Sequence, residues 1–379
     1  TVKQVSGSSW SAVLPVCALM RRSLVYSTPQ EAARKIGGEY GKEENQLRNP
    51  RHAVADGGEI LVADTHNHRI VVLNLEGIWR HSFGAFGHGL GMLSQPHGIA
   101  VRGGRVYVAD TGNHRIAIFS RTGNWLGSWG GIANGDSEMF SYPHSVCWSG
   151  DNFFVSSMGS NQVVVLDEKG GEILRLGNPP GSTQMRRQSR VSAPLNQLSW
   201  PKGVAVNDDQ TYVCDTGHHC VKVFNQQGEC IRSWSLVESS SDGTPSDVAC
   251  LEFAWGIASF GKHVFVAQQA GRKVLAFTLD GELVNSVSIP GSGDFTGLSV
   301  DEQSIYVCDD DEHCVWRLWR AGNGGVVSEK PTARTVSGPS PLRSKPQQGW
   351  AAQIAKAAQQ VSVPSVALDN DSVLVGDLP

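Results

Sequence analysis

One interval recurs along this sequence and constrains its fold more than any other feature. A proline stands fourteen residues before an aspartate at Pro50 and Asp64, and again at Pro96 and Asp110. The same spacing persists, with other residues, from 143 to 157, 201 to 215, 254 to 268 and 295 to 309. Self-similarity of this kind is typical of chains built from repeated supersecondary units. We infer six repeats, over residues 48–84, 95–130, 142–177, 200–235, 253–287 and 293–328.

Each repeat has the pattern of short β-strands. Apolar runs such as 106–108 and 116–119 are rich in β-branched and aromatic residues, and turns such as 122–124 separate them. A four-stranded sheet cannot bury both of its faces alone, so neighbouring sheets must pack together. Radial packing that closes on itself leaves only short, protected edges. The sequence therefore predicts an all-β fold, a β-propeller of four-stranded blades in a single domain over residues 1–379.

Composition narrows the class of protein further. The net charge is 32 − 36 = −4, so there is no bulk positive field that would make nucleic acid the default partner. Hydrophobic residues make up 40% of the chain, yet no apolar run approaches the roughly 20 residues that span a bilayer. The 43 glycines lack a three-residue period, which excludes collagen. A soluble, strand-rich globular protein remains.

The two ends of the chain bear on the number of blades. Residues 364–377 repeat the first half of a unit, one residue short. Residues 11–17 and 23–27 supply candidates for the missing half. Pairing 361–379 with 10–28 would seal the ring as a hybrid blade, which predicts seven blades. The alternative is six blades with decorating tails.

The second repeat carries a recognisable signature. It has Pro-His-Gly-Ile-Ala-Val from Pro96, Val-Tyr-Val-Ala-Asp ending at Asp110, and Asn-His-Arg-Ile from Asn113. This pattern resembles the NHL repeat, and the copies at 50–84 and 95–130 match it best. The later copies diverge at 160–163, 218–221 and 271–274. The resemblance implies a propeller over 48–328. Some proteins of this family bind single-stranded RNA on a basic top face, and the similar peptidylglycine amidating lyases use a histidine-bound zinc.

The Asp-x-x-Asn-His-Arg motif contains residues that are also typical of active sites. It occurs at Asp64, His68 and Arg69, and again at Asp110. An active site needs its groups once, whereas recurrence indicates a structural role in turns and between blades. We interpret this motif as structural.

A better functional candidate is the position that follows the proline, or its equivalent, at the beginning of each innermost strand. One such side chain per blade should enter at the channel mouth, so residues distant in sequence should converge on the axis. These residues are Arg51, His97, His144, Lys202, Trp255, Thr296 and Ser365. The first four form a cationic arc, and the fifth places a tryptophan beside it. This arrangement suits a carboxylate, a phosphate or an acidic peptide. The alternative is that these residues have no binding role and are polar only because the loops at the mouth of a propeller face water.

Two rival functions use the same residues. His97 and His144 offer two zinc ligands, but catalytic zinc generally takes three, and His52 should point elsewhere. We therefore predict no metal and no cofactor, with a metal-dependent lyase or hydrolase as an alternative. Arginines 186, 187 and 190 add local positive charge, so single-stranded RNA binding is a second alternative.

Three insertions break the repeat period, at 178–199, 236–252 and 321–363. Each joins the outer strand of one blade to the inner strand of the next, so all three should emerge on one face. Long loops on a rigid scaffold are where binding usually resides. We predict a non-enzymatic scaffold that binds protein partners and is a structural subunit of a larger complex. Its partner and oligomeric state leave no mark in the sequence.

The cysteines give a last prediction. Cys214 with Cys220, and Cys308 with Cys314, flank tight turns and would face each other if each turn were symmetric about residue 217 or 311. A cross-strand disulfide is one interpretation, and reduced core thiols are the one we favour. Reduced thiols fit an intracellular or organellar location better than a secreted one.

Overall fold

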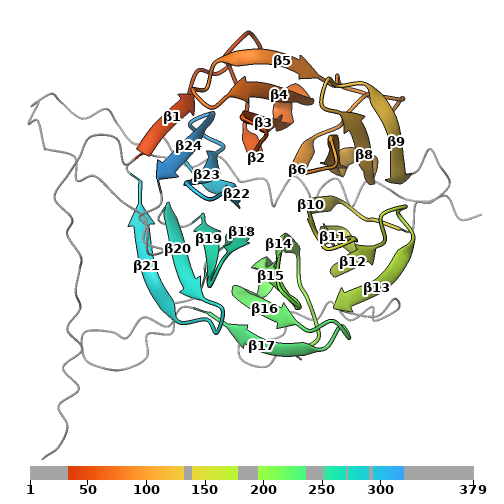
Figure 1. Ribbon diagram of the computed structural model, residues 1–379, viewed down its shortest axis with the longest axis vertical. Coiled ribbons are helices and arrows are strands. Elements are labelled where there is room, and N and C mark those ends of the chain that lie inside the picture. Colours follow the sequence, from red (N-terminus) through yellow and green to blue (C-terminus); the bar gives the residue numbers. More distant parts are fainter. Residues whose placement is uncertain are drawn as a thin grey trace, which may run out of the picture. The chain divides into compact units, whose positions relative to one another are not determined.

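A propeller of six blades makes up the described part of the chain. The computed structural model describes residues 33–131, 139–177, 195–235, 251, 253–269, 272–289 and 293–319. All of them belong to one compact unit, Thr1–Lys330. Figure 1 shows six four-stranded sheets around an axis, with the first strand of each blade innermost and the last outermost. The predicted all-β propeller is confirmed.

The strands of the first three blades follow the chain without interruption. Blade 1 is β2 (Pro50–Asp56), β3 (Glu59–Asp64), β4 (Arg69–Asn74) and β5 (Trp79–Phe83). Blade 2 is β6 (Pro96–Arg102), β7 (Arg105–Asp110), β8 (Arg115–Ser120) and β9 (Trp125–Gly130). Blade 3 is β10 (Pro143–Ser149), β11 (Asn152–Ser157), β12 (Gln162–Leu166) and β13 (Glu172–Gly177).

The sixth blade differs from the others because it takes a strand from the start of the chain. Blade 4 is β14 (Pro201–Asn207), β15 (Gln210–Asp215), β16 (Cys220–Phe224) and β17 (Cys230–Trp234). Blade 5 is β18 (Ala254–Phe260), β19 (His263–Gln268), β20 (Lys273–Thr278) and β21 (Leu283–Ser288). Blade 6 is β22 (Phe295–Val300), β23 (Ser304–Asp309), β24 (Cys314–Trp319) and β1 (Ala33–Gly37). Among the described residues, short 3-10 helices follow the second strand of blades 1 to 4, at Thr65–Asn67, Thr111–Asn113, Met158–Ser160 and Thr216–His218.

The fourteen-residue interval of the sequence is a cross-strand pair. Pro50 lies opposite Asp64 in the first hairpin, Pro96 opposite Asp110, and Phe295 opposite Asp309. The same pairing holds in the other three blades. A fixed interval between paired residues fixes the hairpin length and its register. The repeat therefore places every first strand at the same depth around the axis.

The ring closes at blade 6, so the prediction of seven blades was wrong and the alternative of six is confirmed. β1 pairs antiparallel with β24, from Ala33 opposite Leu318 to Gly37 opposite Cys314 (Figure 1). β1 supplies the fourth strand of blade 6, whereas the sequence analysis placed the whole of this blade within the sixth repeat, residues 293–328. It also satisfies the edge of β24, and Ile36 is buried in the core between blades 6 and 1. The proposed pairing of 361–379 with 10–28 lies outside the described residues.

Apolar cores lie between adjacent blades. Among the described residues there are six such clusters, one for each joint of the ring. The joint between blades 6 and 1 is as apolar as the rest, with Ile60 and Val62 of β3 against Tyr306 of β23. No joint is left open, so six blades complete the ring.

Glycine permits the innermost strands to approach closely. A Cβ at Gly98 would lie 2.7 Å from Ser145 Cα, and one at Gly297 would lie 2.1 Å from the Arg51 carbonyl oxygen. Neither distance can be tolerated without movement of backbone. The glycine after Pro-x in the repeat is therefore a packing requirement at the axis.

The cysteine pairs are offset by one residue from the predicted symmetry. Cys220 lies opposite Asp215 and Cys314 lies opposite Asp309. Because successive side chains of a strand point to opposite faces, the two cysteines of each pair lie on different faces of their blade. The cross-strand disulfide geometry was wrong, and all four cysteines are buried free thiols, as favoured.

Other predictions fall on residues that are not described. Of the insertions 178–199, 236–252 and 321–363, only 195–199 and 251 are described. The single domain over 1–379 stays a prediction, because residues 320–379 lie outside the described part. No helix in the described ranges is long and apolar enough to cross a membrane.

Candidate functional site

The structure brings the predicted channel-mouth residues together. We call Arg51, His97, His144, Lys202 and Trp255 the mouth cluster; each is the second residue of the first strand in blades 1 to 5. Four of its members, all but Lys202, line one cavity to which all six first strands contribute. The cavity volume is about 20 Å³, which holds a water molecule rather than a substrate.

Trp255 occupies the centre of the cluster. Its ring centroid lies 4.7 Å from Arg51 Cζ, 3.0 Å from Lys202 Nζ and 5.3 Å from the His144 ring. Blade 5 therefore contacts blades 1, 3 and 4 through one side chain. Two cations close to one indole ring are attracted by its quadrupole, which stabilises the arrangement. The sequence predicted an aromatic group beside a cationic arc, whereas the structure places the indole in the middle of it.

The two histidines stack instead of converging on a common point. The rings of His97 and His144 are 4.5 Å apart and only 16° from parallel. Nδ1 of His97 also lies 2.6 Å from the Thr111 hydroxyl. Stacked rings present their faces to each other, while metal ligation requires ring nitrogens that point at one position. The geometry is that of a packed pair.

His52 lines the same cavity, although the sequence suggested that it should point elsewhere. Its Nδ1 lies 3.2 Å from the Ile99 backbone nitrogen, and its Nε2 lies 3.3 Å from the Leu298 carbonyl oxygen. These contacts join blade 1 to both of its neighbours. Burial lowers the pKa of His52 to about 4, so this ring is neutral near pH 7.

Asp310 contacts the mouth cluster, and the sequence analysis missed it. Its carboxylate pairs with Arg51 across the closing joint at 2.9 Å, and both side chains are more than nine-tenths buried. Thr65, Thr111 and Thr216 hold the equivalent position in other blades, and each donates to the carbonyl of the next blade's first residue. The sequence did contain a signal for this residue, because Asp310 stands where three other repeats have threonine. This aspartate replaces a neutral contact between blades with an ion pair.

Burial and like charge control the ionisation of the mouth. Burial, with Arg51 and Lys202 nearby, holds the pKa of His97 well below its ordinary value. Burial also holds the pKa of His144 well below its ordinary value, with smaller effects from His97 and Lys202. Burial, followed by repulsion from Arg51, lowers the pKa of Lys202 well below 10.5. The histidines are therefore neutral near pH 7, and an anion beside Lys202 would relieve its unfavourable environment.

Among the mouth residues, Lys202 and Trp255 are the two that solvent reaches. Arg51, His97 and His144 are each less than 10% exposed, while Lys202 and Trp255 are partly exposed. Arg51 already carries Asp310 as its carboxylate partner. Lys202 is thus the accessible cation of the cluster.

The Asp-x-x-Asn-His-Arg motif is structural, as predicted. Asp110 accepts from the Ser94 backbone N–H at 2.6 Å, from Asn113 at 2.7 Å and from Arg115 Nε at 2.8 Å. Arg115 also donates to the Met92 carbonyl at 2.7 Å. The motif therefore ties the segment that enters each blade to the turn after the second strand. Asp64 makes the same set of contacts in blade 1.

The histidine of the motif joins adjacent blades. His68 and His114 have left-handed backbone, with φ of 55°. Nδ1 of His68 accepts from the Gln95 backbone N–H at 3.0 Å, and Nδ1 of His114 accepts from that of Tyr142 at 3.2 Å. In blade 3 the side-chain oxygen of Asn161 does the same. Each contact fixes the residue that precedes the next innermost strand.

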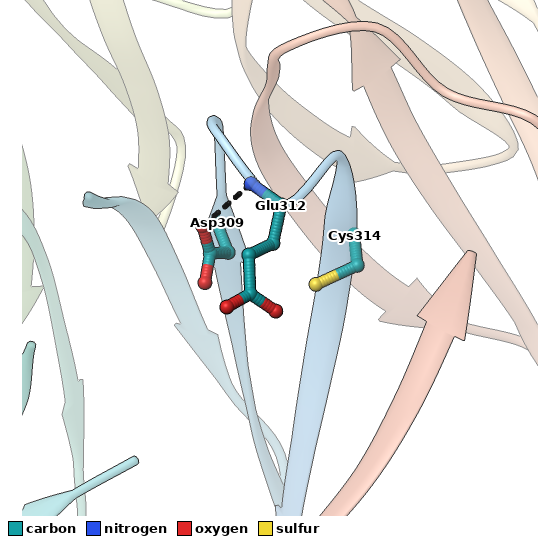
Figure 2. A group of neighbouring side chains, drawn as sticks. All are labelled: Asp309, Glu312 and Cys314. Atoms are coloured by element: carbon teal, nitrogen blue, oxygen red, sulfur yellow. Dashed lines mark hydrogen bonds between the residues drawn. The ribbon is translucent and has the colours of Figure 1, made fainter. Parts of the chain in front are cut away.

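An acidic group with a cysteine lies at the turn between β23 and β24. Figure 2 shows Asp309, Glu312 and Cys314 around one point, with the Glu312 backbone N–H donating to Asp309 at 3.1 Å. Arg272 Nη2 lies 2.6 Å from Asp309, and Lys35 Nζ lies 2.9 Å from Glu312. Two cations already neutralise these carboxylates. The group is an ion-pair network that joins blades 5 and 6 to β1.

The comparisons with known proteins agree with this architecture. A family model of the NHL repeat matches residues 47–73, 93–119 and 198–224. No curated protein sequence matches the chain. The fold is similar to virginiamycin B lyase from Staphylococcus aureus, at 12% identity and a TM-score of 0.52, over 76% of this chain and 99% of that one. It is also similar to a chain of a nidogen/laminin complex, at 14% identity and a TM-score of 0.52, over 67% and 85%.

Identities this low show the fold alone, because one fold carries many functions. Three matched repeats and six antiparallel blades agree with the motifs found in the sequence. The chain is therefore a β-propeller that contains NHL repeats.

Proposed function

We propose that this protein is a non-enzymatic interaction scaffold, a structural subunit of a larger complex, which binds an acidic segment of a protein partner across the mouth cluster. The observation that carries the proposal is the contact of Lys202 with Trp255: the side chain of Lys202 is partly exposed, and its ammonium lies 3.0 Å from the Trp255 ring centre, where burial lowers its pKa. A cavity of about 20 Å³ supports binding at the surface of the mouth over a reaction inside it.

A carboxylate gains more from Lys202 than from an ordinary surface lysine. The ammonium has lost much of its hydration, so a partner oxygen would replace water that burial has removed. Arg51 would attract the partner's carboxylate only through its electrostatic field and would not contact it, because its guanidinium is already paired with Asp310. The loops 178–199, 236–252 and 321–363 remain predicted contact points for further partners.

Replacing Lys202 with methionine is expected to weaken binding of a labelled oligoglutamate peptide roughly 10–100-fold, the usual worth of a hydrogen bond to a charged group. Methionine keeps an apolar stem on Trp255, so packing is preserved. Fluorescence anisotropy measures the affinity, with an oligoglutamine peptide as the ligand control. Lys262→Met, at the exposed turn after β18, is the matched protein control. Equal affinities for wild type and Lys202→Met would refute the proposal.

The same binding should depend on pH with a defined sign. Because the pKa of Lys202 is lowered, this group loses its proton at a lower pH than a free lysine. We expect the affinity for oligoglutamate to fall as pH rises through that lowered pKa, while glutamate itself stays ionised. An affinity that is constant over this range, or that rises with pH, would contradict a role for Lys202.

The two rival functions give distinct outcomes. Stoichiometric zinc in purified protein that is lost on His97→Ala would support a metal-dependent lyase or hydrolase and would overturn the scaffold reading. Oligonucleotide affinity that falls steeply with salt, and less steeply once Arg51 and Lys202 are neutralised, would support single-stranded RNA binding.

A further inference from the structure

Three exposed aromatic residues stand at equivalent joints of blades 2 to 5. Tyr142, Trp200 and Phe253 each precede the first residue of an innermost strand, in β10, β14 and β18. Their exposed fractions are 43%, 50% and 49%. Three large rings with this exposure thus stand at three consecutive joints, and exposed apolar side chains that gather on one face are typical of interaction sites.

The backbone at these positions does not favour aromatic residues. Tyr142, Trp200 and Phe253 all have left-handed backbone, with φ of 50–51°. The first two joints need the same conformation and carry Asn49 and Gln95, with φ of 48° and 51°. Asparagine tolerates this region well, whereas a bulky side chain there is an outlier. The packing of the blades therefore explains why the backbone is left-handed at these joints, but it does not explain why three of them carry aromatic residues. Backbone strain of this kind is typical of functional positions.

The three rings adjoin the mouth cluster. Each lies two residues before one of its members, so Tyr142 precedes His144, Trp200 precedes Lys202 and Phe253 precedes Trp255. The blade-to-blade contacts hold this entry backbone in place. The Tyr142 ring lies 4.4 Å from the His114 ring at an angle of 59°, and the Trp200 backbone N–H donates to Asn161 at 2.8 Å. Tyr142, Trp200, Phe253 and Lys202 thus all stand at the beginnings of neighbouring innermost strands, at one end of the channel.

We propose that Tyr142, Trp200 and Phe253 form a docking surface for an extended peptide segment of a partner protein, in which apolar or aromatic side chains flank one carboxylate. The carboxylate binds Lys202 and the flanking side chains pack on the three rings. This inference rests on the proposed function and gives its partner a defined chemistry. Tryptophan and tyrosine are enriched among the residues that dominate binding energy at interfaces.

Charge favours a peptide over a nucleic acid. Within the mouth cluster, Arg51 is neutralised by Asp310, which leaves Lys202 as the accessible cation. Asp294 and Asp311 stand beside Asp310 and make this part of the rim acidic. One cation next to carboxylates complements a single carboxylate, whereas nucleic acid presents a row of phosphates and needs several cations.

The test uses the full chain and a phage-displayed library of random peptides of about twelve residues. We expect enriched sequences to combine Asp or Glu with aromatic or aliphatic neighbours. Synthetic copies, measured by fluorescence anisotropy, should bind about tenfold or more weakly to Trp200→Asn and to Phe253→Asn. The melting temperature of both variants should equal or exceed that of wild type, because asparagine relieves the backbone strain.

Ile231→Asn is the matched control, since Ile231 is 46% exposed on the outer strand β17, and it should bind the peptides as wild type does. Peptides that need Lys202 but bind Trp200→Asn and Phe253→Asn normally would overturn this surface and leave the proposed function standing. Enriched peptides that bind Lys202→Met normally would overturn both. An empty selection, or binding of single-stranded RNA that depends on the three rings, would also overturn the proposal.

Discussion

Gly297→Ala is expected to open the ring at the joint between the last and first blades. The new Cβ would lie 2.1 Å from the Arg51 carbonyl oxygen and 2.9 Å from His52 Cα, and both are backbone atoms that cannot rotate away. We expect a loss of about 3 kcal/mol in the free energy of unfolding, the upper end of what overpacking usually costs. With an unfolding entropy of about 2.1 cal/mol/K per residue, that is a fall of roughly 5 °C in melting temperature for a domain of this size. Calorimetry or thermal circular dichroism measures it.

Gly89→Ala is the control for this prediction. Gly89 is exposed, and its nearest contact would be the Met92 sulfur at 3.5 Å, an ordinary van der Waals distance. Neither glycine has a left-handed backbone, so the two variants differ in space and not in φ. A Gly297→Ala protein as stable as Gly89→Ala would show that blades 6 and 1 do not pack as described.

The strands of the repeated blades could be predicted from the sequence because the same pattern recurs in each repeat. Pro50, Pro201 and Phe295 were placed at equivalent positions from spacing alone, and each begins an innermost strand. The fourteen-residue interval is a hairpin with a fixed register, so it survives when the residues change. The convergence of Arg51 and His97 on one cavity followed directly from that register.

The irregular part was not open to prediction because it occurs once. β1 has a single buried residue, Ile36, so it carries almost no hydrophobic pattern. The contact of Trp255 with Arg51 crosses the axis between blades that are not neighbours in sequence, and no repeat spacing encodes it. Asp310 was hidden because an aspartate in an acidic run of four resembles a solvated turn.

Arg51→Ala should destabilise the protein by about 3–5 kcal/mol at pH 8, the usual cost of removing one partner from a buried ion pair. Asp310 would then remain buried and charged without its cation. In the wild type, burial raises the pKa of Asp310 to about 6, and Arg51 is the main opposing influence. Removing Arg51 therefore raises this pKa further. Chemical denaturation at several pH values measures the difference from wild type.

The sign of the pH effect follows from linkage. A carboxyl group whose pKa is higher in the folded state binds its proton more tightly there, so the stability this adds is complete below about pH 3.8 and is lost as pH rises through the folded pKa. Arg51→Ala should thus recover part of its deficit between pH 8 and about pH 5. His97 and His144 lose the repulsion of Arg51 in this variant, so the effect of Asp310 is measured by comparing Arg51→Ala with a second variant that also lacks Arg51.

Asp310→Asn supplies the decisive control for the ion pair. In the Arg51→Ala/Asp310→Asn protein the Asp310 site holds no carboxylate, so this protein should be more stable than Arg51→Ala at pH 8. Its advantage over Arg51→Ala should shrink between pH 8 and pH 5, because Asp310 takes up a stabilising proton over that range and asparagine cannot. A deficit in Arg51→Ala that is independent of pH would instead mean that the loss comes from the packing of Arg51 on Trp255. The pair between Arg51 and Asp310 would then contribute little, and the first and last blades would be held mainly by apolar contacts, by β1 and by hydrogen bonds such as that of His52 to Leu298.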